Sequence, residues 1–324
     1  MSRPRISVVV PTFRRPKLLQ RCLLALCAQD LDPGDYEIIV ADDGPSAETA
    51  RTVDAMGAQP GCPRMRCLPV LQTQGPAGAR NLGWRSAEAL LIAFTDDDTI
   101  PHPGWLRAGL EALEAGADAA VGRTIVPAPE PPTDYERGVA GLERAEFITA
   151  NCFARRRALE RVGGFDERYE RAWREDSDLQ FALMEHGCRI VAAPAAIVVH
   201  PVRPARWGVS LGQQRQVMYD ALLYRKYPRH YRQRIRPRPP LDYYAAVLAL
   251  GLVVAGLVAG RPALALGGLV VWVVLTLALC RRRLRGASRS MRHVLEMLVT
   301  SALIPPLALF WRMVGSIRYR VVFT

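Results

Sequence analysis

Three consecutive carboxylates, Asp96, Asp97 and Asp98, are the residues of this chain best placed to do chemistry. They follow the apolar run 89–94, which is short and bounded and therefore predicts a buried strand. Ligands bind at strand ends in open α/β sheets, and three like charges there repel one another unless a cation neutralises them. Oxygen ligands suit Mg²⁺ or Mn²⁺, ions that usually also hold substrate phosphates. An acidic loop that only caps the next helix is the alternative.

A second pair of carboxylates, Glu175 and Asp176, precedes an apolar helical pattern over residues 179–183. A hydroxyl group is a poor nucleophile until its proton leaves, and a carboxylate beside it can take that proton as the new bond forms. The pair is therefore a candidate general base. Acidic residues in the first turn of a helix also suit the helix dipole, which is the alternative role.

Apolar runs and helical patterns alternate through the first hundred residues. Short, mostly apolar runs predict buried strands, and patterns with apolar residues on one face predict the helices between them. The predicted strands are 6–10, 36–41, 66–70 and 89–94, and the predicted helices are 17–29, 47–56 and 77–89. This alternation predicts βαβ units and a parallel sheet. A helix over 175–186 and a strand over 189–199 follow, and His200 closes that strand.

Polar side chains follow the first two predicted strands. Residues 11–15 link the first strand to a helix N-terminus, which is a natural place for a nucleotide. Asp42 ends the second strand, where a carboxylate can accept hydrogen bonds from a base or a ribose, or can merely cap a helix. Near the start of the third helix, Arg80 can meet a diphosphate or remain a surface arginine. The sequence has no G-x-G-x-x-G, so a dinucleotide fold is not supported.

Charge divides the chain into an acidic front and a basic back. Residues 1–200 carry 23 basic and 28 acidic side chains, whereas 201–238 carry ten basic against one acidic. Residues 281–324 carry nine arginines against one acid. A basic tail can bind nucleic acid or an anionic membrane. Because long apolar runs accompany this tail, we expect the membrane and no nucleic acid.

Two uncharged runs, 243–259 and 263–280, have lengths at the short end for membrane-spanning helices. Two buried helices of a soluble domain are the alternative. Basic residues flank the pair on both outer sides, so these flanks are expected in the cytoplasm. The run 294–311 is weaker, because Glu296 and two prolines interrupt it, and it is either a third span or an interfacial helix.

The N-terminus lacks the apolar core and cleavage site of a signal peptide. Seven cysteines are present without a Cys-x-x-Cys pair, which predicts reduced, mostly structural thiols and a cytosolic catalytic portion.

The order of several short motifs resembles that of the family 2 glycosyltransferases over roughly residues 5–225. The motifs are residues 7–13 (SVVVPTF), 42–44 (DDG), 78–83 (GARNLG), 96–98 (DDD), 164–167 (GFDE) and 175–179 (EDSDL). Each is weak alone, but their order and spacing together are specific. The resemblance implies a GT-A fold, a nucleotide-sugar donor, a divalent metal and inversion at the anomeric carbon.

The resemblance also implies a role for each matching residue. On the donor side, the loop residues Pro11, Thr12, Phe13 and Arg15 contact the nucleoside, Asp42 the nucleobase, Arg80 the diphosphate and Asp96 the ribose, with Asp97 assisting. Asp98 is the metal ligand, and His200 is a second ligand or a structural histidine. On the acceptor side, Asp176 is the base and Glu175 the fallback.

Together these features predict an α/β GT-A domain with a mixed, mostly parallel sheet over residues 1–225. A basic, proline-rich linker (226–240) and a membrane region (241–324) follow. The predicted enzyme uses Mg²⁺ or Mn²⁺ to move a sugar from a nucleotide-sugar donor to a lipid-linked or glycan acceptor, as in the synthesis of cell-envelope polysaccharide. Its catalytic domain faces the cytoplasm from the inner or plasma membrane. The alternatives are a metal-dependent nucleotidyltransferase and a non-catalytic membrane scaffold.

The sequence also bears on processivity. The run Gln213-Gln214-Arg215 departs from the Q-x-x-R-W of processive polysaccharide synthases, since residue 217 is valine and no tryptophan follows. This favours transfer of a single sugar.

Overall fold

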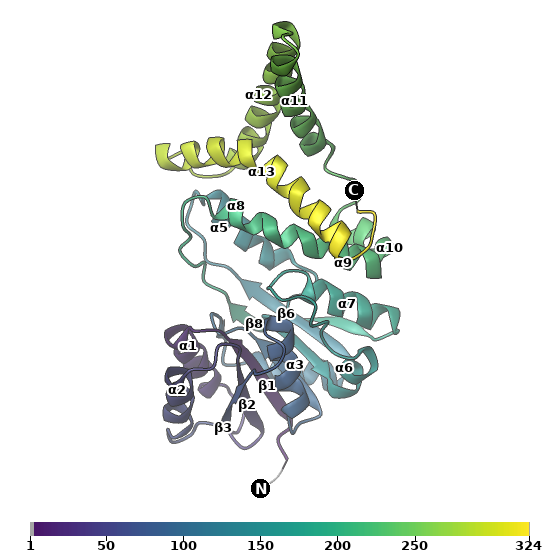
Figure 1. The fold of residues 1–324 in the computed structure, drawn as a ribbon. Coiled ribbons are helices and arrows are strands. Elements are labelled where there is room, and N and C mark those ends of the chain that lie inside the picture. The colour runs from purple at the N-terminus through teal and green to yellow at the C-terminus, as the bar shows by residue number, and fades with distance from the viewer. Residues whose placement is uncertain (1–2, 324) are drawn as a thin grey trace. The chain divides into compact units, whose positions relative to one another are not determined.

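The computed structural model describes residues 3–323, which form two compact units (Figure 1). The first unit comprises residues 3–127 and 140–202. The second comprises the short segment 128–139 together with residues 203–323.

Four parallel strands form one half of the sheet in the first unit, in the order β3-β2-β1-β4. Strands β1, β2 and β4 are mostly apolar and buried because helices cover both faces of the sheet, whereas the edge strand β3 carries Arg64 and Arg66 and is only partly buried. The strands are β1 (Ile6–Thr12), β2 (Tyr36–Asp42), β3 (Arg64–Pro69) and β4 (Leu91–Thr95), and the connecting helices are α1 (Pro16–Cys27), α2 (Ala47–Gly57) and α3 (Pro76–Ser86). The predicted βαβ units are therefore confirmed.

The other half of the sheet is mixed. Strand β7 runs antiparallel to both β4 and β6, while β6 pairs in parallel with β8 and the short β5 closes the edge. The elements are β5 (Ile100–Pro101), β6 (Ala119–Ile125), β7 (Asn151–Arg155) and β8 (Ile190–Val199), with the helices α4 (Trp105–Glu114), α6 (Arg156–Val162) and α7 (Glu175–Glu185) and the 3₁₀ turn η1 (Gly141–Arg144). Four of the seven strand pairings are parallel, as the predicted mixed, mostly parallel GT-A sheet requires.

Two apolar cores enclose this sheet, one on each face. Leu23 of α1 and Trp105 of α4 belong to one core, and Trp84 of α3 and Leu179 of α7 belong to the other. The register places the carboxyl ends of β1 and β2 side by side, since Thr12 pairs with Asp42. Strand β4 lies on the other side of β1 and ends directly before the acidic triplet. The predicted site residues therefore gather along one edge of the sheet.

The second unit is helical. Its long helices are α11 (Leu241–Val258), α12 (Pro262–Leu284) and α13 (Met291–Arg318), and each is long and apolar enough to cross a membrane. Shorter helical segments precede them: α5 (Asp134–Ala140, whose last residue lies in the first unit), α8 (Val209–Gln213), η2 (Gln214–Gln216), α9 (Val217–Lys226), α10 (Pro228–His230) and η3 (Tyr231–Ile235).

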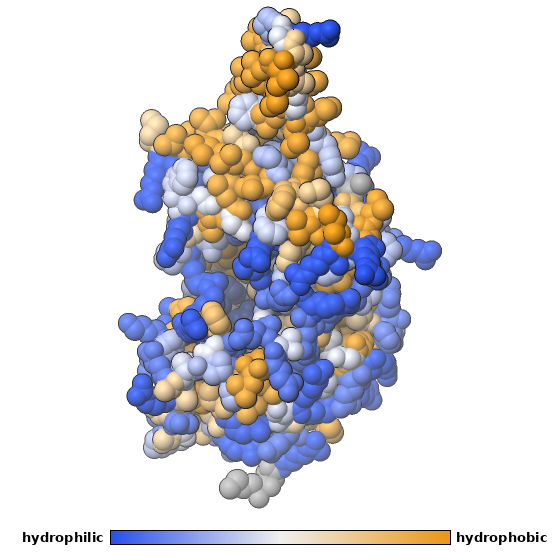
Figure 2. Space-filling view, in the orientation of Figure 1, coloured by the Kyte–Doolittle hydropathy of each residue, from blue (hydrophilic) through white to orange (hydrophobic). Residues whose placement is uncertain are grey.

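Small residues bring α11 and α12 together as an antiparallel hairpin. A Cβ added at Gly256 would lie 2.5 Å from the backbone of Ala265, and one at Gly268 would lie 2.8 Å from the carbonyl oxygen of Ala249. Close backbone approach at small residues is typical of helices packed within a bilayer. An ion pair between Asp242 and Arg282 at 3.1 Å joins the two open ends of the hairpin. Exposed apolar side chains cover its sides (Figure 2).

Candidate active site

The acidic triplet lies in a tight turn directly after β4. The Thr95 and Thr99 hydroxyls are 2.7 Å apart across this turn, and the backbone N–H of Thr99 donates to the carbonyl oxygen of Asp96 at 3.2 Å. These bonds fix the backbone of the turn, so the three carboxylates keep separate directions. Each carboxylate consequently has different neighbours.

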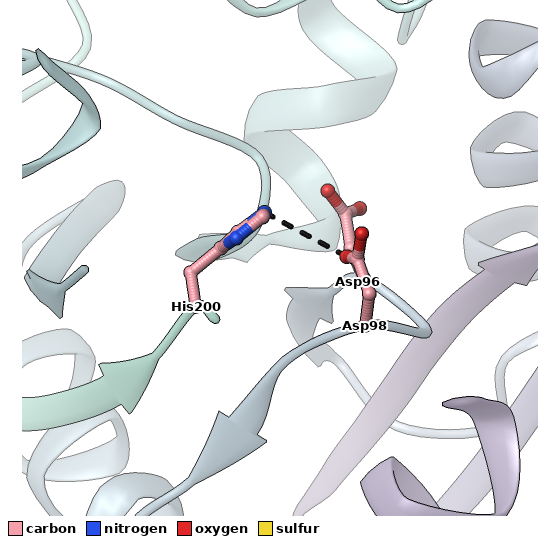
Figure 3. A group of neighbouring side chains, drawn as sticks. All are labelled: Asp96, Asp98 and His200. Atoms are coloured by element: carbon pink, nitrogen blue, oxygen red, sulfur yellow. Dashed lines mark ion pairs between the residues drawn. The ribbon is translucent and has the colours of Figure 1, made fainter. Parts of the chain in front are cut away.

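Asp96, Asp98 and His200 form a group that can hold a metal ion (Figure 3). One ligand atom from each lies within 4.8 Å of the other two. Nε2 of His200 and Oδ1 of Asp98 are 3.6 Å apart, which is too long for a hydrogen bond but fits two ligands of one ion with bonds of about 2.1 Å. The other ring nitrogen of His200, Nδ1, is buried and has no hydrogen-bond partner within residues 3–323. The residues therefore fit a divalent cation.

Asp97 is tied to the loop after β1. The Thr12 hydroxyl donates to its Oδ2 atom at 2.7 Å, and Nη1 of Arg15 lies 3.3 Å from its Oδ1 atom. Burial raises the pKa of Asp97 to about 6, although the Thr12 hydrogen bond and the charge of Arg15 oppose that shift. The structure thus brings two predicted loop residues, Thr12 and Arg15, against the triplet.

Arg80 is a buried cation shared by two carboxylates. Its Nη2 atom donates to Asp96 at 2.7 Å, and its Nη1 atom donates to Glu175 at 3.2 Å. Its side chain is only 3% exposed, and its guanidinium lies 5.8 Å from the centre of the Phe165 ring. Arg80 therefore joins the triplet to the first turn of α7, and it is not a surface arginine.

Glu175 and Asp176 begin α7 after Arg174, whose φ of 74° is a left-handed conformation that non-glycine residues rarely adopt. Burial, followed by the charge of Asp176, raises the pKa of Glu175 to about 7, although Arg80 opposes this. Burial also raises the pKa of Asp176. The Oδ1 atom of Asp176 accepts the backbone N–H of Ser177 at 2.6 Å. The pKa of Glu175 thus suits a proton acceptor near neutral pH, and the pKa of Asp176 is shifted in the same direction.

Asp42 lies at the predicted strand end, where it is buried and organises its own loop. Its two carboxylate oxygens accept the backbone N–H groups of Gly44 at 3.0 Å and Ser46 at 3.1 Å. The Phe13 ring covers Gly44 so closely that a Cβ there would lie 2.9 Å from it. The β1 and β2 loops therefore meet beside Asp42, and Phe13 remains half-exposed.

Two residues matter more in the structure than the sequence indicated. Asp43 accepts the backbone N–H of Gly75 at 2.8 Å and thereby fixes the start of α3. Asn81 holds the turn at Phe165 through hydrogen bonds to both its N–H and its carbonyl oxygen, at 2.9 and 2.8 Å. The sequence feature that could have indicated these two residues is their position within the DDG and GARNLG motifs.

The mixed α/β sheet, with acidic and basic side chains at the ends of β1, β2 and β4, is the architecture expected of a GT-A glycosyltransferase. The sequence matches "Glycosyl transferase family 2" over residues 7–165 and "Glycosyl transferase family group 2" over residues 91–314. The chain belongs to the family 2 glycosyltransferases.

Individual relatives agree with this assignment. Glycosyltransferase AglE of Haloferax volcanii is 26% identical over 241 residues, which cover 69% of this chain and 77% of AglE. The GalNAc(5)-diNAcBac-PP-undecaprenol beta-1,3-glucosyltransferase of Campylobacter jejuni is 31% identical over 151 residues, which cover 46% of this chain. The matched region spans 47%, or about half, of that enzyme's length.

A solved structure has the same fold. The mannosyltransferase PcManGT from Pyrobaculum calidifontis, in complex with GDP-Man and Mn²⁺, aligns with a TM-score of 0.54 over 99% of this chain and 88% of that one. The sequence identity is 19%, so this likeness concerns the fold.

Proposed function

We propose that this enzyme moves one sugar from a nucleotide-sugar donor to a membrane-associated acceptor with inversion, by a single displacement that depends on a divalent metal. The observation that carries the proposal is the group formed by Asp96, Asp98 and His200, whose spacing fits one cation. A bound Mg²⁺ or Mn²⁺ would supply a Lewis acid that stabilises the leaving nucleoside diphosphate. PcManGT, which shares the fold, was solved with GDP-Man and Mn²⁺.

The donor side of the proposed site is the carboxyl edge of β1, β2 and β4. The loop from Pro11 to Arg15 and the carboxylate of Asp42 would bind the nucleoside, since the two loops meet at Phe13 and Gly44. Asp98 and His200 would hold the cation, and Asp96, whose carboxylate belongs to the same group, would also reach the ribose. Arg80 would keep Asp96 in place from the buried side.

The acceptor side is the first turn of α7. Asp176 would take the proton of the acceptor hydroxyl as the new glycosidic bond forms, because burial raises its pKa above the ordinary value and makes the carboxylate a stronger base. Glu175, held by Arg80, is the second candidate for this role. As the acceptor oxygen bonds to the anomeric carbon, the bond from that carbon to the diphosphate would break, and the nucleoside diphosphate would leave on the donor side with the electron pair.

The acceptor is proposed to be lipid-linked or a membrane-associated glycan. Three apolar helices follow the catalytic domain, and the Campylobacter relative is named for an undecaprenol-linked acceptor. Arg281, Arg282, Arg283 and Arg285 lie at the end of α12, on the same side of the hairpin as Asp242. Positive flanks favour the cytoplasm, so we place the catalytic domain on that side. This domain comprises about residues 1–225, and a linker over 226–240 follows it.

The test is the metal dependence of Asp98→Asn in the full chain. We expect turnover of the productive nucleotide sugar to fall at least about 100-fold, and Mn²⁺ to lose its nucleotide-dependent stabilisation of the protein against heat. Asp54→Asn, an exposed residue of α2, is the matched control and should retain both properties. Full activity of Asp98→Asn, or parental activity that persists in EDTA, would refute the proposed metal role.

A further inference from the structure

Helix α13 is apolar enough to be a third membrane span, but its packing points to a different orientation. It has 28 residues and is therefore about 42 Å long. If it crossed the bilayer, its two ends would lie on opposite sides of the membrane. The contacts of its two halves within the second unit decide between a crossing helix and one that lies along the membrane surface.

The first half of α13 packs on polar segments at the base of the α11–α12 hairpin. Nε2 of His293 accepts the backbone N–H of Asp134 at 3.2 Å, and Glu296 accepts that of Gly208 at 2.7 Å. The buried Arg283, at the end of α12, donates to the Thr300 hydroxyl at 2.7 Å. This half of α13 therefore lies where the hairpin ends.

The second half of α13 packs along α9. A Cβ added at Gly315 would lie 2.6 Å from the carbonyl oxygen of Met218, so the two helix backbones are in close contact there. Just beyond α13, the Tyr319 carbonyl oxygen accepts from the Arg225 guanidinium at 2.7 Å. Figure 1 shows α13, in yellow, running beside α9 within this unit.

The segment 209–226, which comprises α8, η2 and α9 and packs against α13, cannot itself lie across a bilayer. It carries Arg215, Asp220, Arg225 and Lys226 and belongs to the stretch 201–238, which has ten basic residues. Each charge at the centre of a bilayer costs about 2.5–3.5 kcal/mol on insertion scales. The first half of α13 is held at the basic end of the hairpin and its second half lies along this charged segment, so its two ends are expected on the same side of the membrane.

The outward face of α13 is nevertheless suited to lipid. Every exposed residue from 295 to 317 is apolar. These residues are Leu295, Leu298, Val299, Leu303, Phe310, Met313 and Ile317. Exposed arginines occur only near the ends of the helix, at Arg292 and Arg318 among residues 291–318. An apolar face with basic ends is typical of a helix at the boundary between headgroups and acyl chains of an anionic membrane.

We propose that α13 lies in the plane of the membrane interface, with its apolar face in the acyl-chain boundary and its basic ends at anionic headgroups. Only α11 and α12 then cross the bilayer. The occupant of the exposed α13 face is the lipid surface, which is continuous with the lipid around the α11–α12 hairpin. An apolar cavity of about 370 Å³ between α12 and α13, lined by residues such as Trp272 and Leu303, lies along this same junction.

Labelling of single cysteines in the full chain tests the side on which each end lies. Arg261→Cys reports the hairpin turn, and Met291→Cys and Val322→Cys report positions that are 83% and 85% exposed at the start of and just beyond α13. The unsubstituted chain, whose seven cysteines are buried or half-buried, gives the background. We expect an impermeant maleimide to label Arg261→Cys in intact cells, and the other two only after the membrane is opened.

Labelling of Val322→Cys but not of Met291→Cys from outside would show a third span and overturn the proposal. If both were labelled from outside and Arg261→Cys were not, the in-plane orientation would stand, and only the cytoplasmic placement of the catalytic domain would be wrong. The experiment therefore separates this inference from the proposed function.

The depth of the helix in vesicles containing anionic lipid gives a second test. Nitroxides at Leu295, Leu303 and Phe310, each exposed, should report depths that agree within about 5 Å for a helix in the interface. A crossing helix would spread the outer two positions over about 22 Å along its axis, with Leu303 deepest. That depth profile would also overturn the proposal.

Discussion

Replacement of Arg80, whose guanidinium is buried, should destabilise the folded protein by an amount that follows from the contacts of this group. Arg80 lies 2.7 Å from Asp96 and 3.2 Å from Glu175, and all three groups are at least partly withdrawn from water. Arg80→Met keeps the length of the side chain and removes its charge. Loss of one partner from a buried ion pair costs about 3–5 kcal/mol. For a unit of this size, that lowers the melting temperature by roughly 6–20 °C.

The stability lost in Arg80→Met should depend on pH, because one of the two partners of Arg80 is the titratable Glu175. Its pKa is raised to about 7 in the folded protein, and removal of Arg80 raises it further. A carboxyl group with a raised pKa destabilises the folded state above that pKa, and this effect fades as the pH falls toward the unfolded value. Well below pH 7, Glu175 is protonated with or without Arg80. The part of the destabilisation that comes from the charge of Glu175 then disappears. We expect the destabilisation at pH 6 to be roughly half of that at pH 9.

The assay is thermal unfolding of the full chain in detergent at pH 6 and pH 9. Arg85→Met is the matched control, because Arg85 lies on the same helix, is 53% exposed and pairs with Glu167 at 3.4 Å. A surface pair contributes about 0–1 kcal/mol, so the control should shift by no more than about 4 °C. Equal effects of the two variants, or an Arg80→Met effect that is the same at both pH values, would refute the reasoning.

Two further predictions concern the acceptor side and the hairpin. Asp176→Asn should lower turnover about 10²–10⁴-fold while the donor dissociation constant changes little, and a larger loss in Glu175→Gln would assign the base to Glu175 instead. In the hairpin, Gly268→Val should lower stability by about 1–3 kcal/mol, since a Cβ there meets the Ala249 carbonyl oxygen at 2.8 Å. Gly267→Val should be nearly neutral in the same melting experiment, because a Cβ at Gly267 meets no described atom within 4 Å.

The strands β1, β2 and β4 of the parallel half could be predicted from sequence because they are buried on both faces. Residues 6–10 and 36–41 are almost continuously apolar, so no periodic pattern was needed to find β1 and β2. The C-terminal apolar helices were as clear, because two uncharged runs of 17 and 18 residues, bounded by clusters of arginine, match the length that a helix needs to cross a bilayer.

The strands β6 and β7 were not located in the sequence, for a physical reason. Strand β6 contains Gly122 and Arg123 at a register shift, and β7 has only five residues. Both depend on partners distant in the sequence, since β7 pairs with β4 about sixty positions earlier. Likewise, Arg80 and Glu175 are 95 positions apart, so the fold alone brings them together.

The acidic triplet persists in a buried turn because its three carboxylates do not share one environment. Asp96 is neutralised by Arg80 at 2.7 Å. Asp97 accepts a hydrogen bond from the Thr12 hydroxyl, and burial raises the pKa of Asp97 to about 6. Asp98 instead faces His200 at 3.6 Å, a separation that a shared cation would bridge. This division supports the proposal that Asp98 is the principal metal ligand, and it explains why one strand end can hold three adjacent acids.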